Sequence, residues 1–295
     1  MRARLAVAFT LASCCLVAGA FPQEPPARER FGHVARPASA ATPAAIGGYS
    51  KGCLLGAERL AATGDSWQAM RLSRNRYWGH PRLIRFIEDF AEAAQAGGWP
   101  GLLVGDLAQP RGGPMLTGHR SHQIGLDADL WFLPAPDEPL ETDERETLSA
   151  VSMLGSDGKT VDPARFRREH VKLLETAARF PEVARIFVNP AIKRALCETV
   201  DGNRNWLAKI RPWWGHHYHF HVRLNCPDGD DSCVDQPPPP AGDGCDSSLA
   251  WWFSDDAARR LAAASAAPSR ELELADLPEQ CRSLVTDQPD THPEG

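Results

Sequence analysis

The sequence predicts an α+β domain with a central antiparallel sheet, flanking helices, disulfide-tied loops and a proline-rich C-terminal wrap. Three observations carry this prediction. Residues 126–132 and 218–224 alternate apolar and polar side chains, as strands with one buried face do. Residues 81–94 place apolar side chains at helical spacing. Finally, 24 glycines and 25 prolines among 295 residues indicate extensive loops.

Each element follows from a local pattern. Glycines end the first helix, and proline is tolerated at the first turn of the last one. Three glycines and two prolines make residues 109–118 a loop. In chain order, the expected elements are a helix from Pro81 to Gly97-Gly98, a strand over 102–104, the loop over 109–118, a strand over 126–132, a helix over 163–179, a strand over 185–188, a helix from Pro190 and a strand over 218–224.

The N-terminus has the pattern of a secretory signal peptide. Arg2 and Arg4 precede an apolar stretch that ends in Ala18-Gly-Ala20, so cleavage is expected after residue 20. The segment Leu11-Ala-Ser-Cys14 leaves lipoprotein processing at Cys14 as a minor alternative. Residues 21–46 are rich in proline and alanine, and we expect them to form a leader without a core. We therefore predict a folded domain over residues 47–285 and a polar tail over 286–295.

Composition excludes two classes of partner. No apolar run reaches the roughly 18 residues of a membrane span. The formal net charge is −6, and no basic stripe is present, so binding to nucleic acid is not expected.

The cysteines predict disulfides. Two of the eight, Cys14 and Cys15, fall in the signal peptide, which leaves an even number in an exported chain. Six cysteines allow fifteen pairings, and spacing alone selects none of them. No Cys-x-x-Cys pair occurs, which argues against a thiolate zinc site. The remaining cysteines are Cys53, Cys197, Cys226, Cys233, Cys245 and Cys281.

Two histidine-rich segments, residues 118–129 and 213–221, predict a metal site. Alternation places Asp129 on the polar face of one strand and His221 on the polar face of the other. If the strands lie in one antiparallel sheet, these two side chains meet, and His122 arrives from the preceding loop. Two imidazoles and one carboxylate with an open fourth position are typical of catalytic zinc. Neither His-Glu-x-x-His nor its inverse occurs, so the helix-based zinc peptidases are not the template.

The same segments resemble the penicillin-insensitive murein endopeptidases, part of the wider lysostaphin, D-Ala-D-Ala metallopeptidase and hedgehog-like group. The resemblance covers residues 47–281, nearly the whole chain after the signal peptide. Its motifs are Gly118-His-Arg-Ser-His-Gln-Ile-Gly-Leu-Asp-Ala-Asp129, Arg185-Ile-Phe-Val-Asn-Pro-Ala-Ile-Lys193, His216-x-x-His219-x-His221-Val-Arg223, Asp235-Gln-Pro and Gly242-Asp-Gly-Cys245.

The resemblance implies a periplasmic zinc enzyme that cuts the D-alanyl–meso-diaminopimelate cross-links of peptidoglycan. It implies a second histidine near the metal, His119, and two active-site histidines that are not ligands, His216 and His219. A second metal at Asp157 is doubtful, because the family's Asp-Gly-Lys-His reads Asp157-Gly-Lys-Thr160 here. The disulfides that the resemblance implies are Cys53–Cys281, Cys197–Cys245 and Cys226–Cys233.

Position suggests roles for the histidines outside the ligand set. His219 shares the ligand face but lies two residues from His221, roughly 7 Å along a strand, so we assign it to proton transfer or oxyanion stabilisation. We place His216 in the same set. His217 lies on the same nominal face, and the resemblance gives it no role. Two alternatives to the endopeptidase stay open: a D,D-carboxypeptidase or dipeptidase acting on the same wall peptides, and a zinc-binding recognition module without activity.

Overall fold

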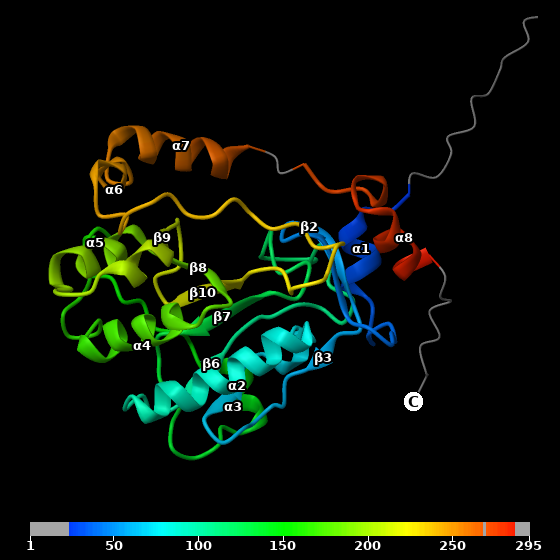
Figure 1. Ribbon diagram of the computed structural model, residues 1–295, viewed down its shortest axis with the longest axis horizontal. Coiled ribbons are helices and arrows are strands. Elements are labelled where there is room, and N and C mark those ends of the chain that lie inside the picture. Colours follow the sequence, from blue (N-terminus) through cyan, green and yellow to red (C-terminus); the bar gives the residue numbers. More distant parts are fainter. Residues whose placement is uncertain (1–23, 268–269, 287–295) are drawn as a thin grey trace, which may run out of the picture.

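A six-stranded sheet with helices packed against it forms the centre of the protein (Figure 1). This computed structural model describes residues 24–267 and 270–286. The expected signal peptide with Cys14, and residues 287–295 of the expected tail, lie outside that range. Within it, no helix combines the length and apolar character needed to cross a bilayer.

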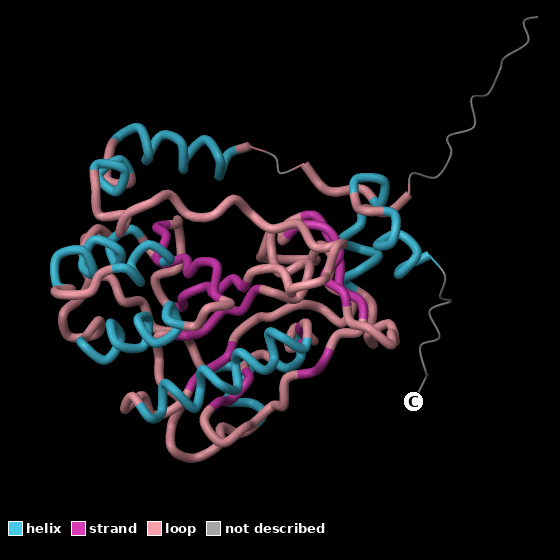
Figure 2. Tube along the Cα trace, viewed as in Figure 1, coloured by secondary structure: helices cyan, strands magenta, loops and turns pink. Residues whose placement is uncertain are grey.

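Long loops connect the helices and strands along the chain (Figure 2). The strands are β1 Ala44–Gly48, β2 Lys51–Leu55, β3 Glu58–Arg59, β4 Trp67–Ala69, β5 Trp78–Gly79, β6 Leu102–Val104, β7 Asp127–Trp131, β8 Val183–Val188, β9 Ile210–Pro212 and β10 His219–Leu224. The α-helices are α1 Ala27–Gly32, α2 Pro81–Ala96, α3 Thr142–Thr147, α4 Arg168–Arg179, α5 Pro190–Thr199, α6 Ser247–Trp251, α7 Asp255–Ala266 and α8 Glu279–Thr286. Three short 3₁₀ helices are η1 Leu72–Arg74, η2 Asn205–Lys209 and η3 Leu274–Asp276.

The central sheet is mixed, with strand order β4-β6-β7-β10-β8-β9. Its four inner strands are antiparallel, as expected. Each outer strand, however, runs parallel to its neighbour, so the prediction of an antiparallel sheet is only partly correct. The reason is the connection: α2 lies between β4 and β6, and α5 lies between β8 and β9, which gives each pair the crossover that parallel strands need. Both outer strands have only three residues, too few for a periodic pattern.

The apolar face of the sheet forms the core together with α2 and α4. Phe90 of α2 packs edge-on against Phe220 of β10, with ring centroids 6.4 Å apart. Leu130 of β7 and Val222 of β10 are fully buried in the same cluster. The alternation that predicted these strands therefore marks the buried face correctly, and the polar face of β7 and β10 is left to the histidines and carboxylates. Helix α4 begins at Arg168, later than the predicted start at residue 163.

The N-terminal segment departs from the expected leader. Ala27 and Phe31 of α1 are buried in a second apolar cluster with Leu274, Leu277 and the Cys53–Cys281 pair. Phe31 thus has a partner surface supplied by residues some 240 positions away, beyond the reach of local composition. Two chain ends that lack a core separately form one together.

All six cysteines of the described residues form disulfides, and the pairs are those that the resemblance implies: Cys53–Cys281, Cys197–Cys245 and Cys226–Cys233. The C-terminal wrap runs without a helix from residue 225 to 246 and then forms α6 and α7, which were not predicted. Fully buried Lys193 also holds this wrap, because its Nζ donates to the carbonyl oxygens of Leu207 and Asp243.

The long-range disulfide should contribute most to stability. Replacing Cys53 and Cys281 together by alanine should lower the free energy of unfolding by about 2–5 kcal/mol, since the bridge closes a separation of 228 residues. The matched Cys226→Ala/Cys233→Ala variant opens a separation of only 7 and should lose less. Denaturant unfolding without reductant measures both; a free thiol at Cys53 in the non-reduced wild-type protein would contradict the assignment.

Candidate metal centre

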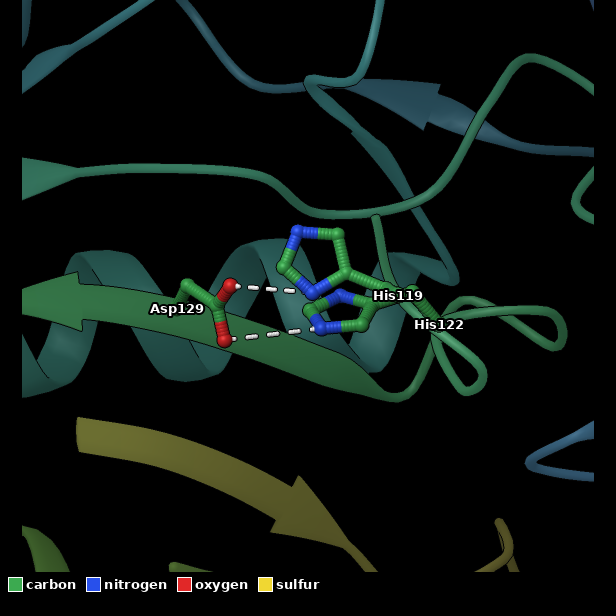
Figure 3. Close-up of side chains that lie close together, drawn as sticks. All are labelled: His119, His122 and Asp129. Atoms are coloured by element: carbon green, nitrogen blue, oxygen red, sulfur yellow. Dashed lines mark ion pairs between the residues drawn. The ribbon is translucent and has the colours of Figure 1, made fainter. Parts of the chain in front are cut away.

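Two histidines and one carboxylate converge at the start of β7 (Figure 3). His119 and His122 come from the loop before the strand, and Asp129 comes from the strand itself. His119 Nδ1 lies 3.4 Å from Asp129 Oδ2, and His122 Nε2 lies 3.4 Å from Asp129 Oδ1. One ligand atom from each residue lies within 4.8 Å of the others, so the group could hold a metal ion.

His221 joins this group through the pairing of β7 with β10. The register places His221 directly opposite Asp129, as the alternation of the two strands predicts. His221 Nδ1 lies 3.2 Å from Asp129 Oδ1, and the ring centroids of His122 and His221 are 4.7 Å apart. His119, His122 and His221 therefore surround the carboxylate of Asp129.

The buried donor atoms of this cluster fit a cation. His122 is fully buried, yet neither ring nitrogen has a hydrogen-bond partner, and Asp129 Oδ1 has none either. Burying polar atoms without partners costs about 1–3 kcal/mol each. A metal ion among them offsets that cost, and imidazole with carboxylate is a donor set that zinc accepts.

Two further carboxylates orient the histidines from outside. Asp127 accepts hydrogen bonds from His221 Nε2 at 2.9 Å, from Arg223 Nε at 2.7 Å and from the backbone nitrogen of His122 at 2.9 Å. Asp106 accepts one from His119 Nε2 at 3.0 Å. In both rings the Nε2–H is thus engaged, so Nδ1 faces Asp129. Such carboxylate–histidine pairs fix the tautomer of metal-ligating imidazoles.

Arginines keep these outer carboxylates charged. Burial alone would raise the pKa of Asp127, but Arg223 and His221 hold it well below its usual range. Burial would likewise raise the pKa of Asp106, yet His119, with Arg74 and Arg76, lowers it to about 2. Sequence analysis gave Asp127 no role and missed Asp106, because Asp106 follows a three-residue strand and belongs to no motif.

His219 and His216 lie beside the cluster. His219 Nε2 is 3.5 Å from Asp129 Oδ1, so the two-residue offset along β10 does not keep it away from the ligand group. His216 Nδ1 donates to the carbonyl oxygen of Trp214 at 2.9 Å, and its ring centroid is 5.1 Å from that of His219. Burial lowers the pKa of His219 and lowers that of His216 to about 3. Both rings are therefore neutral near pH 7.

The strand β8–helix α5 junction holds the loop of His216. The backbone nitrogen of Asn189 donates to the carbonyl oxygen of His216 at 2.9 Å, and its Nδ2 donates to that of Gly215 at 2.9 Å. Asn189 also caps α5, accepting from the nitrogen of Ala191. One residue of the 185–193 motif thus ties the sheet, a helix and a site loop together.

Two other residues weighed from the sequence lie outside the cluster. His217 pairs its Nδ1 with Ser152 Oγ at 2.9 Å, although alternation had placed it on the nominal ligand face. It precedes the first residue of β10, so strand alternation does not orient it. The Asp157 carboxylate accepts hydrogen bonds from Lys159 and Thr160 within its own turn.

Comparison with known proteins identifies one family. Residues 45–286 match the family described as penicillin-insensitive murein endopeptidase. A protein of that name from Haemophilus influenzae is 46% identical over 201 residues, which are 65% of this chain and 66% of the relative. One from Yersinia enterocolitica is 43% identical over 197 residues, 67% of this chain and 71% of the relative. One from Salmonella paratyphi B is 42% identical over 192 residues, 65% and 70% respectively. The chain thus spans about two thirds of the length of these relatives.

Removing the charge of Asp127 should weaken metal binding without removing a ligand. We expect Asp127→Asn to lower zinc affinity roughly 10- to 100-fold, because His221 loses the carboxylate that fixes its Nδ1 toward Asp129. Asp157→Asn is the matched control and should bind zinc as the wild type does. Titration with a chromogenic zinc chelator measures both, and an unchanged affinity in a folded Asp127→Asn protein would refute the orienting role.

Proposed function

Because the chain belongs to the penicillin-insensitive murein endopeptidase family, we propose that it is a zinc peptidase that hydrolyses the D-alanyl–meso-diaminopimelate cross-links of peptidoglycan. The observation that carries the proposal is the set of buried, unpartnered donor atoms on His122 and Asp129 within the region that matches the family. The names of the relatives support murein as the substrate.

In this proposal zinc binds to His122, Asp129 and His221, with His119 as a neighbouring donor. His122 offers two free ring nitrogens, and the outer carboxylates leave Nδ1 of His221 and His119 directed at Asp129. A zinc ion held there supplies Lewis acidity that polarises a carbonyl group and makes water more acidic. One ion suffices for this role.

Proton transfer and oxyanion stabilisation fall to His219 and His216. The metal-binding group of the described residues holds no glutamate that could act as the base, so an imidazole must move the proton. His219 Nε2 faces the cluster, so a peptide bound beside Asp129 lies within its reach. His216 donates from Nδ1 to Trp214, which leaves Nε2 of the neutral ring as an acceptor.

The compartment that we propose is the periplasm. Three disulfides are typical of proteins that fold in an oxidising space, and peptidoglycan is the substrate available there. The partner is accordingly the cross-linked wall peptide.

Digestion of purified sacculi tests the proposal. The zinc-loaded protein should convert dimeric muropeptides into monomers, which chromatography with mass spectrometry detects. Release of free D-alanine or D-alanyl-D-alanine without loss of dimers would instead indicate a carboxypeptidase or dipeptidase. Binding of sacculi without any cleavage would indicate a recognition module.

Substitutions of His219 and His221 should distinguish catalysis from metal binding. His219→Ala should keep its zinc while cross-link cleavage falls by a factor on the order of 10² or more, the usual scale for a lost acid–base or oxyanion group. His221→Ala should lose zinc and activity together. Zinc analysis and cleavage of dimeric muropeptides measure both.

The control for this pair is His217→Ala, which removes an imidazole from the same segment and should retain most of the activity, since His217 contacts Ser152 instead of the cluster. Loss of zinc from His219→Ala would contradict its role as a non-ligand, and wild-type turnover would contradict its role in catalysis.

A further inference from the structure

A cavity of about 340 Å³ opens directly beside the metal centre. Three residues of the centre line it: His119, Asp129 and His219. Two arginines, Arg71 and Arg74, line the same cavity, together with the rings of Trp131 and Tyr218. A peptide bond placed at Asp129 would therefore have two guanidinium groups within the same enclosure.

The side chain of Arg71 is held by neutral hydrogen-bond acceptors and by an aromatic ring. Its guanidinium donates to the carbonyl oxygens of Arg145 at 3.2 Å and Leu148 at 2.7 Å, and it lies 5.7 Å from the centroid of Trp131. Within residues 24–267 and 270–286, no carboxylate forms an ion pair with it. Arg74, by contrast, pairs with Asp106 at 3.1 Å. At longer range its charge acts on Glu146: burial would raise the pKa of that carboxyl, but hydrogen bonds from Ser73 and the charges of Arg71 and Arg74 lower it. Among the described residues, Arg71 is thus a half-buried cation without a direct ion pair, and it lies beside the metal centre.

The fold holds Arg71 at a conformational cost. Its backbone φ is 57°, in the left-handed region that residues other than glycine rarely adopt, and its nitrogen donates to the carbonyl oxygen of Arg145. Glu146 fixes the following turn, accepting from the nitrogen and Oγ of Ser73 at 2.9 and 2.7 Å. A surface arginine that needed no fixed position would not require this support.

We infer that Arg71 binds the free carboxylate on the carbon that carries the scissile nitrogen, with Arg74 adding positive potential. This inference rests on the proposed function. In the D-alanyl–meso-diaminopimelate cross-link, the scissile amide nitrogen is attached to a carbon that also bears a free carboxylate. Guanidinium groups recognise carboxylates through paired, charge-assisted hydrogen bonds.

The assignment requires a particular distance between the guanidinium and the scissile nitrogen. Standard bond lengths place a carboxylate oxygen roughly 3 Å from that nitrogen, and a charge-assisted hydrogen bond adds about 2.8 Å. The guanidinium should thus lie roughly 6 Å from the scissile nitrogen. Arg71 and Asp129 line the same cavity, and Arg71 lies over the ring of Trp131, two residues beyond Asp129 on the same face of β7.

Arg71 selects for the carboxylate and not for endo- over exo-cleavage, because D-alanyl-D-alanine carries a carboxylate at the same position. What Arg71 discriminates against is a substrate in which that carboxylate is an amide, since the carboxamide is neutral and brings its own N–H donors toward the guanidinium.

The test uses two muropeptide dimers that differ only in this group, carboxylate against carboxamide, and the corresponding monomeric products. Zinc-loaded wild-type protein, Arg71→Gln and the control Arg85→Gln, which removes an exposed arginine of α2, are compared. Calorimetry measures binding of each product, and chromatography measures kcat/KM on each dimer. Zinc content and Tm of all three proteins are checked.

The wild type and Arg85→Gln should bind the carboxylate product roughly 10- to 100-fold more tightly than the carboxamide product, the scale of hydrogen bonds to a charged group. Arg71→Gln should bind the two nearly equally, and the same pattern should appear in kcat/KM. If Arg71 had only a structural role, Arg71→Gln should weaken the binding of both products alike.

An Arg71→Gln protein that still prefers the carboxylate, or a wild type without any preference, would overturn the inference. The calorimetric measurement of product binding tests the inference by itself, because it does not depend on cleavage. Failure of the wild type to cleave either dimer would instead refute the proposed function, so the two failures are distinguishable.

Discussion

The antiparallel pairing of β7 with β10 is the constraint on which the site depends. It places Asp129 opposite His221 on one face, while Leu130 and Phe220, also a pair, enter the core on the other. Because side chains alternate with a period of two, a register shift of one residue would bury the carboxylates and expose the core. The packing of Phe220 against Phe90 of α2 therefore fixes the position of the metal-binding face as well as the stability of the sheet.

Ionisable groups on that face are arranged in layers around one carboxylate. Asp129 lies at the centre, imidazoles surround it, and Asp127 and Asp106 lie outside the imidazoles. Arg223 and Arg76 form the outermost layer by pairing with these outer carboxylates. A buried carboxylate is costly unless paired, and here each outer one has both an arginine and a histidine. The histidines are consequently held with fixed ring orientation before any metal binds, which is the pre-organisation that a catalytic site needs.

Sequence predicted the parts of the structure in which local pattern and burial agree. The faces of β7 and β10, the helix from Pro81 and the gathering of His122, Asp129 and His221 follow from periodicity and a single pairing assumption. Parts that depend on distant contacts were not accessible. Phe31 is buried because Leu277 and the Cys53–Cys281 bridge reach it, and Asp106 becomes an orienting group only because the loop carrying His119 folds over it. Strands of three residues carry too little pattern to reveal the parallel edges of the sheet.

Backbone strain gives an independent view of where function lies. Among the described residues, only four that are not glycine adopt a positive φ: Arg71, Asn75, His122 and His216. Two of these are site histidines, and the other two flank η1. Of these two, Arg71 lines the adjacent cavity. Strain of this kind persists only where surrounding contacts enforce it, as Asp127 does at the nitrogen of His122 and Asn189 does at the carbonyl of His216. Arg71 has the same kind of support from Arg145. The backbone of this arginine is thus held in a strained conformation, as the backbones of the two histidines are. An arginine that only contributed charge to the surface would not need a fixed backbone position.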